Sequence, residues 1–234
     1  MIKQVIKLNI LGIPLKIKTD QNAFTPSPHG SKALGSVIKI NKGEKVLDVG
    51  CGTGFLAILA AKMGGIVKGT DILKNAIKLS KQNAIENKVN IDFRIGNLFS
   101  SFEGEVFDVI IANIPQELLS PKIRGQWDKE KIISYSGGKS GSEVLIKTLS
   151  KAKKHMHKKS RLYIVVYTMT NYRKSLGYIV NNYSAKLINF YNGPVKNFVY
   201  EDPIWYENNK DILIYKKAGK YFADLFTFEL RLKN

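Results

Sequence analysis

The stretch EKVLDVGCGTGFLAILAAKMG, residues 44–64, decides the fold. An apolar run at residues 45–49 leads into three glycines at alternate positions, Gly50, Gly52 and Gly54, and then into an apolar segment with helical character. Glycine lets the chain reverse between a strand and a helix, and it lets a ligand approach the backbone where a Cβ would block it. At the carboxyl end of a first parallel strand, such a turn is typical of a nucleotide-like cofactor site.

Three other interpretations of the glycine-rich segments compete with a nucleotide-like cofactor site. A dinucleotide fingerprint requires a glycine at position 55, where the chain has Phe55. A phosphate-binding P-loop at SGGKSG, residues 136–141, requires an earlier glycine at the position of Ile133. The third alternative is a tight strand-to-helix turn without a ligand.

Strand-like and helix-like segments alternate on both sides of this turn, which predicts an α/β fold with a doubly wound, Rossmann-like parallel sheet. The expected strands are residues 45–50, 65–71, 90–96 and 106–114, and the expected helices are residues 55–63 and 73–87. The pattern loosens after residue 115 and then resumes. We expect helices at 142–155 and 171–183, a strand at 161–168, and antiparallel edge strands at 185–191 and 220–233.

The N-terminal residues are expected to form an extension that precedes the main domain. Residues 1–24 alternate apolar and polar side chains around Leu11 and Gly12, which predicts a β-hairpin extension. Residues 25–234 are expected to form the main domain, beginning with a proline-rich loop that becomes helical near Ser31.

Composition limits the functional classes. The 234 residues include 37 Lys and Arg against 19 Asp and Glu, so the net charge is +18. This excess favours polyanionic partners, although lysines spread over solvated surfaces would give the same count. A single cysteine excludes an internal disulfide, the three histidines suggest no metal site, and His155 and His157 are expected to be solvated. No stretch is long and apolar enough to span a membrane, so we expect no membrane partner and a cytoplasmic location.

The following strands carry further candidates. Asp71 ends the second strand, where a carboxylate could accept hydrogen bonds from ribose hydroxyls or could cap the next helix. With VLDVGCGTG, residues 46–54, this makes the chain resemble the class I S-adenosylmethionine-dependent methyltransferases over residues 25–168. The resemblance implies S-adenosylmethionine as cofactor and S-adenosylhomocysteine as product. It also implies cofactor contacts from Asp48, Gly50, Cys51, Gly52 and Gly54 (methionine part), Asp71 and Ile72 (ribose), Asn97 and Leu98 (adenine), and Asn113.

The fourth strand ends in Asn113, Ile114, Pro115 and Gln116. This segment is similar to the Asn-Pro-Pro-aromatic motif of the amino-methylating branch, which includes protein-glutamine and adenine-N6 methyltransferases. SYSGGKSGSEVLIKTL and FTPSPHGSKAL resemble two further segments of the glutamine-modifying family. The resemblance implies that the Asn113 side-chain oxygen and the Ile114 carbonyl hold the acceptor NH2 group.

Two positions depart from that motif, because Ile114 replaces the first proline and Gln116 replaces the aromatic residue. Ribosomal-protein lysine methyltransferases and plant methionine S-methyltransferases carry parts of this altered Asn-Ile-Pro-Gln motif. Either another ring supplies the stacking surface or the acceptor is not planar. The candidate rings are Phe24, Tyr135 and Trp127, and His29 is a further candidate for acceptor contact.

Three functional hypotheses remain open at this point. The first is transfer of a methyl group to a nitrogen of a protein or RNA of the translation machinery, which the basic charge supports. The second is a small-molecule methyltransferase, with Trp205 and Tyr206 covering the pocket. The third is a non-catalytic cofactor-binding or RNA-binding subunit. None of the three requires a metal.

Overall fold

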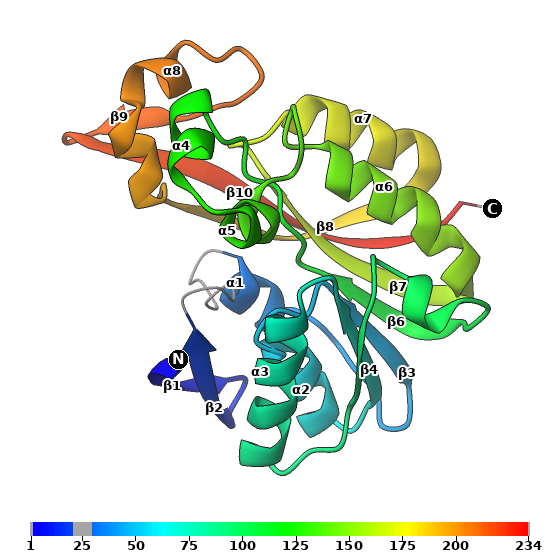
Figure 1. The fold of residues 1–234 in the computed structure, drawn as a ribbon. Helices are drawn as coiled ribbons and strands as arrows, with labels where there is room; N and C mark the ends of the chain where they lie inside the picture. Colours follow the sequence, from blue (N-terminus) through cyan, green and yellow to red (C-terminus); the bar gives the residue numbers. More distant parts are fainter. Residues whose placement is uncertain (1, 21–29, 234) are drawn as a thin grey trace.

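The computed structural model describes residues 2–20 and 30–233, which form an α/β fold with one large sheet (Figure 1). The strands are β1 (Ile2–Ile10), β2 (Ile13–Asp20), β3 (Lys45–Val49), β4 (Ile66–Asp71), β5 (Asp92–Ile95), β6 (Phe107–Ala112), β7 (Met156–Tyr167), β8 (Tyr183–Pro194), β9 (Tyr215–Lys217) and β10 (Lys220–Leu232). The α-helices are α1 (Ser31–Gly35), α2 (Phe55–Lys62), α3 (Lys74–Glu86), α4 (Pro121–Gln126), α5 (Lys129–Tyr135), α6 (Glu143–Ala152), α7 (Tyr172–Asn182) and α8 (Pro203–Glu207). Short 3₁₀ helices lie at Ser100–Phe102, Lys153–His155 and Asn197–Glu201.

The large sheet confirms the doubly wound prediction. Its strand order is β5-β4-β3-β6-β7-β10-β8, and β9 pairs with β10. Strands β3 to β7 run parallel, whereas β10 is antiparallel to both β7 and β8. The chain moves outward from β3 to β5 and then returns to β6 beside β3. This reversal between β3 and β6 is the switch point at which such sheets bind ligands.

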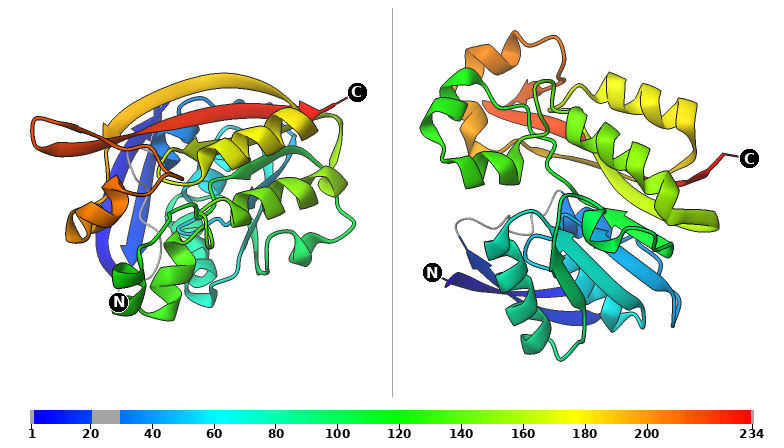
Figure 2. Two further views of the ribbon diagram at one scale, coloured as in Figure 1. Left: turned by 90° about the horizontal axis from the view of Figure 1, so that it is seen from above. Right: turned by 45° about the vertical axis from the view of Figure 1, so that its right-hand side comes forward.

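Both faces of the sheet are covered, which explains the nearly continuous apolar strands. In β6, Val109 and Ile111 pack into the core on one face, and Ile110 and Ala112 pack into the core on the other. Figures 1 and 2 show α6 and α7 over one face, with α2 and α3 on the opposite side. The two cores hold the central strands rigidly, so the side chains at their carboxyl ends have fixed positions.

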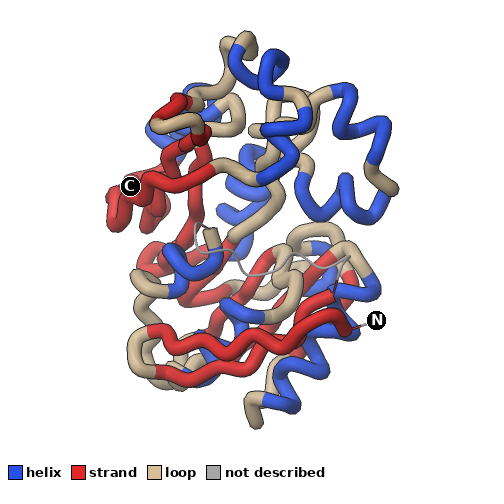
Figure 3. Tube along the Cα trace, turned by 90° about the vertical axis from the view of Figure 1, so that its left-hand side faces the viewer, coloured by secondary structure: helices blue, strands red, loops and turns tan. Residues whose placement is uncertain are grey.

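The predicted hairpin is present and packs against helix α3. Leu11 and Gly12 both have positive φ, 53° and 81°, as a two-residue type I′ turn requires. The side-chain amide of Asn83 accepts from the backbone N–H of Lys18 at 2.8 Å and donates to its carbonyl at 3.0 Å. Asn87 does the same with Lys16, at 3.0 and 2.7 Å. The two asparagines thus replace a neighbouring strand at the edge of β2, which Figure 3 shows beside the helices.

Several boundaries differ from the sequence expectation. Strand β7 begins at Met156 rather than at residue 161, because the backbone of this lysine-rich segment already extends beside β6. Strand β10 lies one position in from the edge, and β8 forms the edge itself. The expectation of a solvated His155 is wrong. Its side chain is 3% exposed, stacks on Phe99 with ring centroids 4.6 Å apart, and forms a hydrogen bond with the carbonyl of Glu105.

Helices α4, α5 and α8 were not anticipated, since they are short and lie where the sequence pattern loosens. Each of the helices in the described part of the chain is too short or too polar to cross a bilayer.

Candidate functional site

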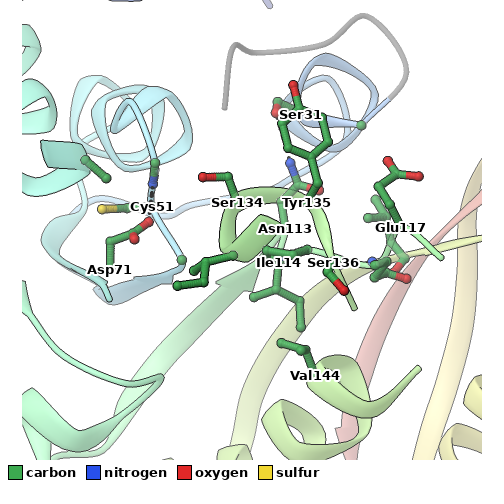
Figure 4. A pocket seen from close by; sticks show the side chains of 18 of the residues that line it. Ser31, Cys51, Asp71, Asn113, Ile114, Glu117, Ser134, Tyr135, Ser136 and Val144 are labelled. Carbon is green, nitrogen blue, oxygen red and sulfur yellow. Dashed lines mark hydrogen bonds between the residues drawn. The ribbon is translucent and has the colours of Figure 1, made fainter. Parts of the chain in front are cut away.

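A cavity of about 530 Å³ opens at the carboxyl ends of β3, β4 and β6, at the switch point of the sheet. The ends of these three strands supply Asp48, Asp71 and Asn113, which are far apart in sequence. Figure 4 shows Cys51 and Asp71 at one end of the cavity and Glu117 at the other, with Asn113, Ile114 and Tyr135 between them. We call these the Asp71 end and the Glu117 end.

The glycine loop forms the wall at the Asp71 end. Gly50, Gly52 and Gly54 have φ values of 69°, 53° and 78°, in the left-handed region that other residues rarely adopt. The N–H groups of Gly50 and Cys51 both donate to the carbonyl of Thr70 at the end of β4, at 2.8 and 3.0 Å. This pairing ties the loop to the neighbouring strand, so the loop is held open toward the cavity.

Asp71 connects the loop to the start of the next helix. Its Oδ2 accepts from the N–H of Gly52 at 2.9 Å, and its Oδ1 accepts from the N–H of Leu73 at 3.0 Å. Burial raises the pKa of this carboxyl above its usual value, although backbone hydrogen bonds from Leu73, Gly52 and Ile72 oppose the shift. A carboxylate offers about four lone-pair sites. Asp71 therefore retains capacity to accept from a ligand hydroxyl.

Asp48 is a buried carboxyl below the glycine loop. Its side chain is 2% exposed, and its Oδ2 accepts from the N–H of Ala57 at 3.0 Å. Burial raises its pKa to about 7, and the nearby charge of Asp71 adds to the shift. Burial raises the pKa of the Cys51 thiol well above its usual value, and the nearby carboxylates of Asp48 and Asp71 add to the shift. A protonated thiol is a poor nucleophile, which agrees with a packing role for Cys51.

The loop after β5 supplies Asn97 and Leu98, and both line the cavity. The N–H of Asn97 donates to the Ser100 hydroxyl at 2.9 Å, which fixes the turn. Leu98 has a φ of 60°, an uncommon conformation for a residue with a Cβ. The strain places an apolar side chain beside a polar one at the rim of the site.

Asn113 follows β6 in the middle of the cavity. Its Nδ2 donates to the hydroxyl of Ser31 at 2.9 Å, at the start of α1. This bond uses one of the two N–H donors of the amide and orients the group, and the side-chain oxygen is the atom that can accept from a ligand. Ile114 and Pro115 continue the wall, and a Cβ at Gly50 would lie 3.2 Å from the Ile114 side chain. The close approach brings the loop and the Asn113 segment together.

Gln116 does not act as a substitute for the missing aromatic ring. Its side chain is 5% exposed, and Nε2 donates to the carbonyl of Val165 in β7 at 2.9 Å. Its Oε1 is buried without a hydrogen-bond partner. The Gly-Gly-x-x-Gly segment packs directly behind it, because a Cβ at Gly137 would lie 2.7 Å from the Gln116 Cα and 2.0 Å from the Gly141 carbonyl oxygen.

Two residues at the Glu117 end were missed by the sequence analysis. Glu117 is 5% exposed; its Oε1 pairs with the ammonium of Lys196, and its Oε2 has no hydrogen-bond partner within residues 2–20 and 30–233. The Lys196 ammonium also lies 4.7 Å from the ring centroid of Tyr135. Glu117 directly follows the fourth-strand motif, which was a usable signal. Lys196 lies in a stretch with no motif.

Most of the predicted residues line this one cavity. They are Asp48, Gly50, Cys51, Gly52, Asp71, Ile72, Asn97, Leu98, Asn113, Ile114, Pro115, Gln116 and Tyr135. Gly54 does not line it: a Cβ there would lie 2.9 Å from Ser80, so the glycine serves the packing of α2 on α3. Phe24 and His29 lie outside the described residues.

The other proposed aromatic residues also lie away from the cavity lining. Trp127 packs edge-on against Tyr135 at 5.1 Å and thereby supports that ring from behind. Tyr206 is fully buried, and its hydroxyl accepts from the N–H of Ser120. Trp205 packs on Tyr206 at 4.9 Å, so the pair does not cover the pocket. Within residues 2–20 and 30–233, no group of three or more His, Cys, Asp and Glu side chains is placed to hold a metal ion.

Comparisons with known proteins agree with this geometry. Residues 40–210 match the family model described as a methyltransferase domain. A Methanocaldococcus jannaschii protein named "Putative protein N5-glutamine methyltransferase" is 32% identical over 168 residues, covering 69% of this chain and 81% of the relative. A ribosomal protein L11 methyltransferase of Thermotoga neapolitana is 41% identical over 80 residues, which are 34% of this chain and 30% of that protein.

Solved structures share the fold at lower identity. A methyltransferase from Pyrococcus furiosus has a TM-score of 0.54 at 19% identity, covering 91% of this chain and 88% of that one. A 16S rRNA N2 G1207 methyltransferase from T. thermophilus, solved with AdoMet and guanosine, has a TM-score of 0.58 at 15% identity. This match covers all of the present chain and 51% of the rRNA enzyme.

Proposed function

This chain belongs to the class I S-adenosylmethionine-dependent methyltransferases, and we propose that it methylates a side-chain nitrogen on a protein of the translation machinery. The proposal rests on Asn113, whose amide nitrogen donates to Ser31 while its oxygen is left to accept from an acceptor NH2 group. Two relatives above 30% identity support a protein acceptor, since their names specify protein glutamine and ribosomal protein L11. The RNA-modifying neighbour shares only the fold.

We infer that the cofactor binds at the Asp71 end of the cavity. The positive-φ glycines leave the backbone bare, Asp71 has lone pairs for ribose hydroxyls, and Asp48 is a buried carboxyl for a cationic ligand. S-adenosylmethionine supplies an activated methyl group on a sulfonium. Asn113 and the Ile114 carbonyl would orient the acceptor nitrogen, and orientation of this kind is worth about 7 to 11 kcal/mol of a barrier.

The test is a methyl-transfer assay with tritiated S-adenosylmethionine on cell extract separated into protein, RNA and small-molecule fractions. We expect label in the protein fraction. Label confined to RNA or to small molecules would contradict the protein acceptor and would favour one of the other two substrate classes. Asn113→Ala should retain cofactor affinity in calorimetry and lose about 100-fold or more of the transfer rate, as removal of a positioned polar group does.

A matched variant separates cofactor binding from acceptor handling. Gly52→Val should abolish cofactor binding, because valine at a φ of 53° is strained and its side chain would enter the space left by the bare loop. If Gly52→Val binds the cofactor as well as the natural chain does, the assignment of the Asp71 end is wrong. If Asn113→Ala transfers at the full rate, the acceptor nitrogen is held elsewhere.

A further inference from the structure

The Glu117 end of the cavity contains an unusual combination of charge and burial. Glu117 is nine-tenths buried, and one of its two carboxylate oxygens is without a hydrogen-bond partner. Burying an ionised carboxylate is costly unless its oxygens are paired. Gln116 adds a second buried oxygen without a partner in a residue that lines the same cavity. Two residues that line this end of the cavity therefore each contain a buried acceptor without a donor among the described residues.

The surroundings of Glu117 are aromatic. Tyr135 and Tyr167 line the cavity with it, and the Glu117 charge, second to burial, contributes to raising the pKa of both phenols. Tyr206 lies behind them, and its pKa is raised first by burial and also by Glu117. A carboxylate among aromatic rings is a favourable environment for an ammonium group, because the ion pair and the ring faces attract it together.

The position of Lys196 supports the inference that the Glu117 end favours an ammonium group. Its ammonium pairs with Glu117 Oε1 and lies 4.7 Å from the centroid of the Tyr135 ring. The structure itself thus holds one ammonium between this carboxylate and this ring. Lys196 lies between β8 and the Asn197–Glu201 helix, and its side chain is about a quarter exposed. A ligand ammonium reaching the same carboxylate would use its second oxygen or displace Lys196.

We propose that Glu117 is a recognition residue that binds an ammonium group on the protein acceptor, next to the side chain that is methylated. The proposal rests on the acceptor side of the proposed methyl transfer. The recognised ammonium is not the methylated nitrogen, because Glu117 lies at the far end of the cavity from Cys51 and Asp71, with Asn113 and Tyr135 between them (Figure 4). A lysine beside the methylated residue has the right chemistry. Glu117 binds and orients the substrate and takes no part in the transfer.

The experiment compares two probes that differ only in the presence of the side-chain ammonium group. N-acetyl-lysine N-methylamide and N-acetyl-norleucine N-methylamide are titrated into the protein saturated with S-adenosylhomocysteine, and binding is followed by ligand-observed NMR. We expect the lysine probe to bind about tenfold or more tightly than the norleucine probe, as for a hydrogen bond to a charged group. Equal binding of the two probes to the natural chain would overturn the proposal.

Three variants identify the residue responsible. Glu117→Gln should remove the preference for the lysine probe without changing affinity for S-adenosylhomocysteine. Lys196→Met removes the resident ammonium and should strengthen binding of the lysine probe. Glu86→Gln is the control, because Glu86 also pairs with a lysine, Lys18 at 3.2 Å, but lies at the end of helix α3 outside the cavity.

Each result decides for or against the proposal. A preference that survives in Glu117→Gln, or weaker lysine-probe binding in Lys196→Met, would refute it. If Glu117→Gln does not fold, Lys196→Met still tests the proposal. We expect it to bind the lysine probe more tightly, whereas a purely structural Glu117–Lys196 ion pair predicts weaker binding. If the Glu117 proposal fails, cofactor binding and label transfer to protein are still expected. Its failure is therefore distinguishable from failure of the proposed function.

Discussion

Ionisation of the buried Asp48 carboxyl lowers the free energy of unfolding, so the stability of the folded protein depends on pH through this group. The carboxyl is 2% exposed and has a pKa of about 7, against 3.8 for the unpaired group. Because the pKa is higher in the folded state, the stability associated with this proton is complete below about pH 4 and is lost as pH rises through about 7. Full ionisation in the folded protein costs about 4 kcal/mol relative to the unfolded chain.

Asp48→Asn removes this titration while the amide oxygen can still accept from Ala57. Unfolding in urea at pH 5, 6, 7 and 8 gives the free energy of unfolding of both proteins. The advantage of the variant over the natural chain should grow by about 2 to 3 kcal/mol between pH 5 and pH 8. The growth with pH is the decisive quantity, since a fixed difference would also include packing effects of the amide.

The same substitution should act in the opposite direction on cofactor affinity. At pH 8 the Asp48 carboxylate is ionised and attracts a cationic ligand, so we expect Asp48→Asn to weaken S-adenosylmethionine binding by about 10-fold or more in calorimetry. At pH 6 the natural carboxyl is largely protonated, and the difference should shrink. The affinity of the natural protein should therefore rise as pH increases through about 7.

Asp108→Asn is the control for Asp48→Asn. The N–H of Lys45 lowers the pKa of Asp108 by hydrogen bonding to its carboxylate, with His157 as a further cause. This variant should be less stable than the natural chain above pH 4 and should gain no advantage as pH rises. If the stability difference for Asp48→Asn stays constant from pH 5 to pH 8, the carboxyl is ionised throughout and the reasoning about its burial is refuted.

Three further substitutions test the frame around the site by urea unfolding. Asn83→Ala removes the two side-chain bonds to Lys18 and one to the carbonyl of Thr53, and should cost about 2 to 3 kcal/mol while speeding amide exchange at Lys18. Gly137→Ala places a Cβ 2.0 Å from a backbone oxygen and should cost more than about 2 kcal/mol. Gly125→Ala has open space around its Cβ in helix α4 and should stabilise by about 0.5 to 1 kcal/mol. Equal effects of the two alanine substitutions would contradict the packing described behind Gln116.

The residues at the Asp71 end of the cavity could be singled out from the sequence for a physical reason. In a parallel sheet, the carboxyl ends of neighbouring strands meet at one edge, so a local strand pattern determines which distant residues come together. Asp48, Asp71 and Asn113 each follow or end an apolar strand, and in the structure they line one cavity. Their roles toward cofactor and acceptor stay predictions.

The Glu117 end could not be predicted in the same way. Glu117 and Lys196 are 79 residues apart, and Lys196 lies in the C-terminal third, where no strand pattern or motif marks it. Gln116 occupies the aromatic position of the motif, and the motif does not show that its Nε2 donates to the carbonyl of Val165. Contacts of this kind depend on how individual side chains pack, which periodicity does not encode. The docking of the hairpin through Asn83 is hidden for the same reason.

The net charge of the chain and the charge of its cavity have opposite signs, and they act over different distances. The net charge of +18 attracts polyanions in general, but salt screens exposed charges beyond about 8 Å. Inside the cavity, Asp71 lies toward one end and Glu117 toward the other (Figure 4), and Asp48 is close enough to Asp71 for that charge to add to its raised pKa. We therefore expect these local carboxyl groups, rather than the net charge of the chain, to determine what the cavity binds. A cationic cofactor at the Asp71 end and an ammonium-bearing protein segment at the Glu117 end, as proposed above, would each face a buried carboxyl group.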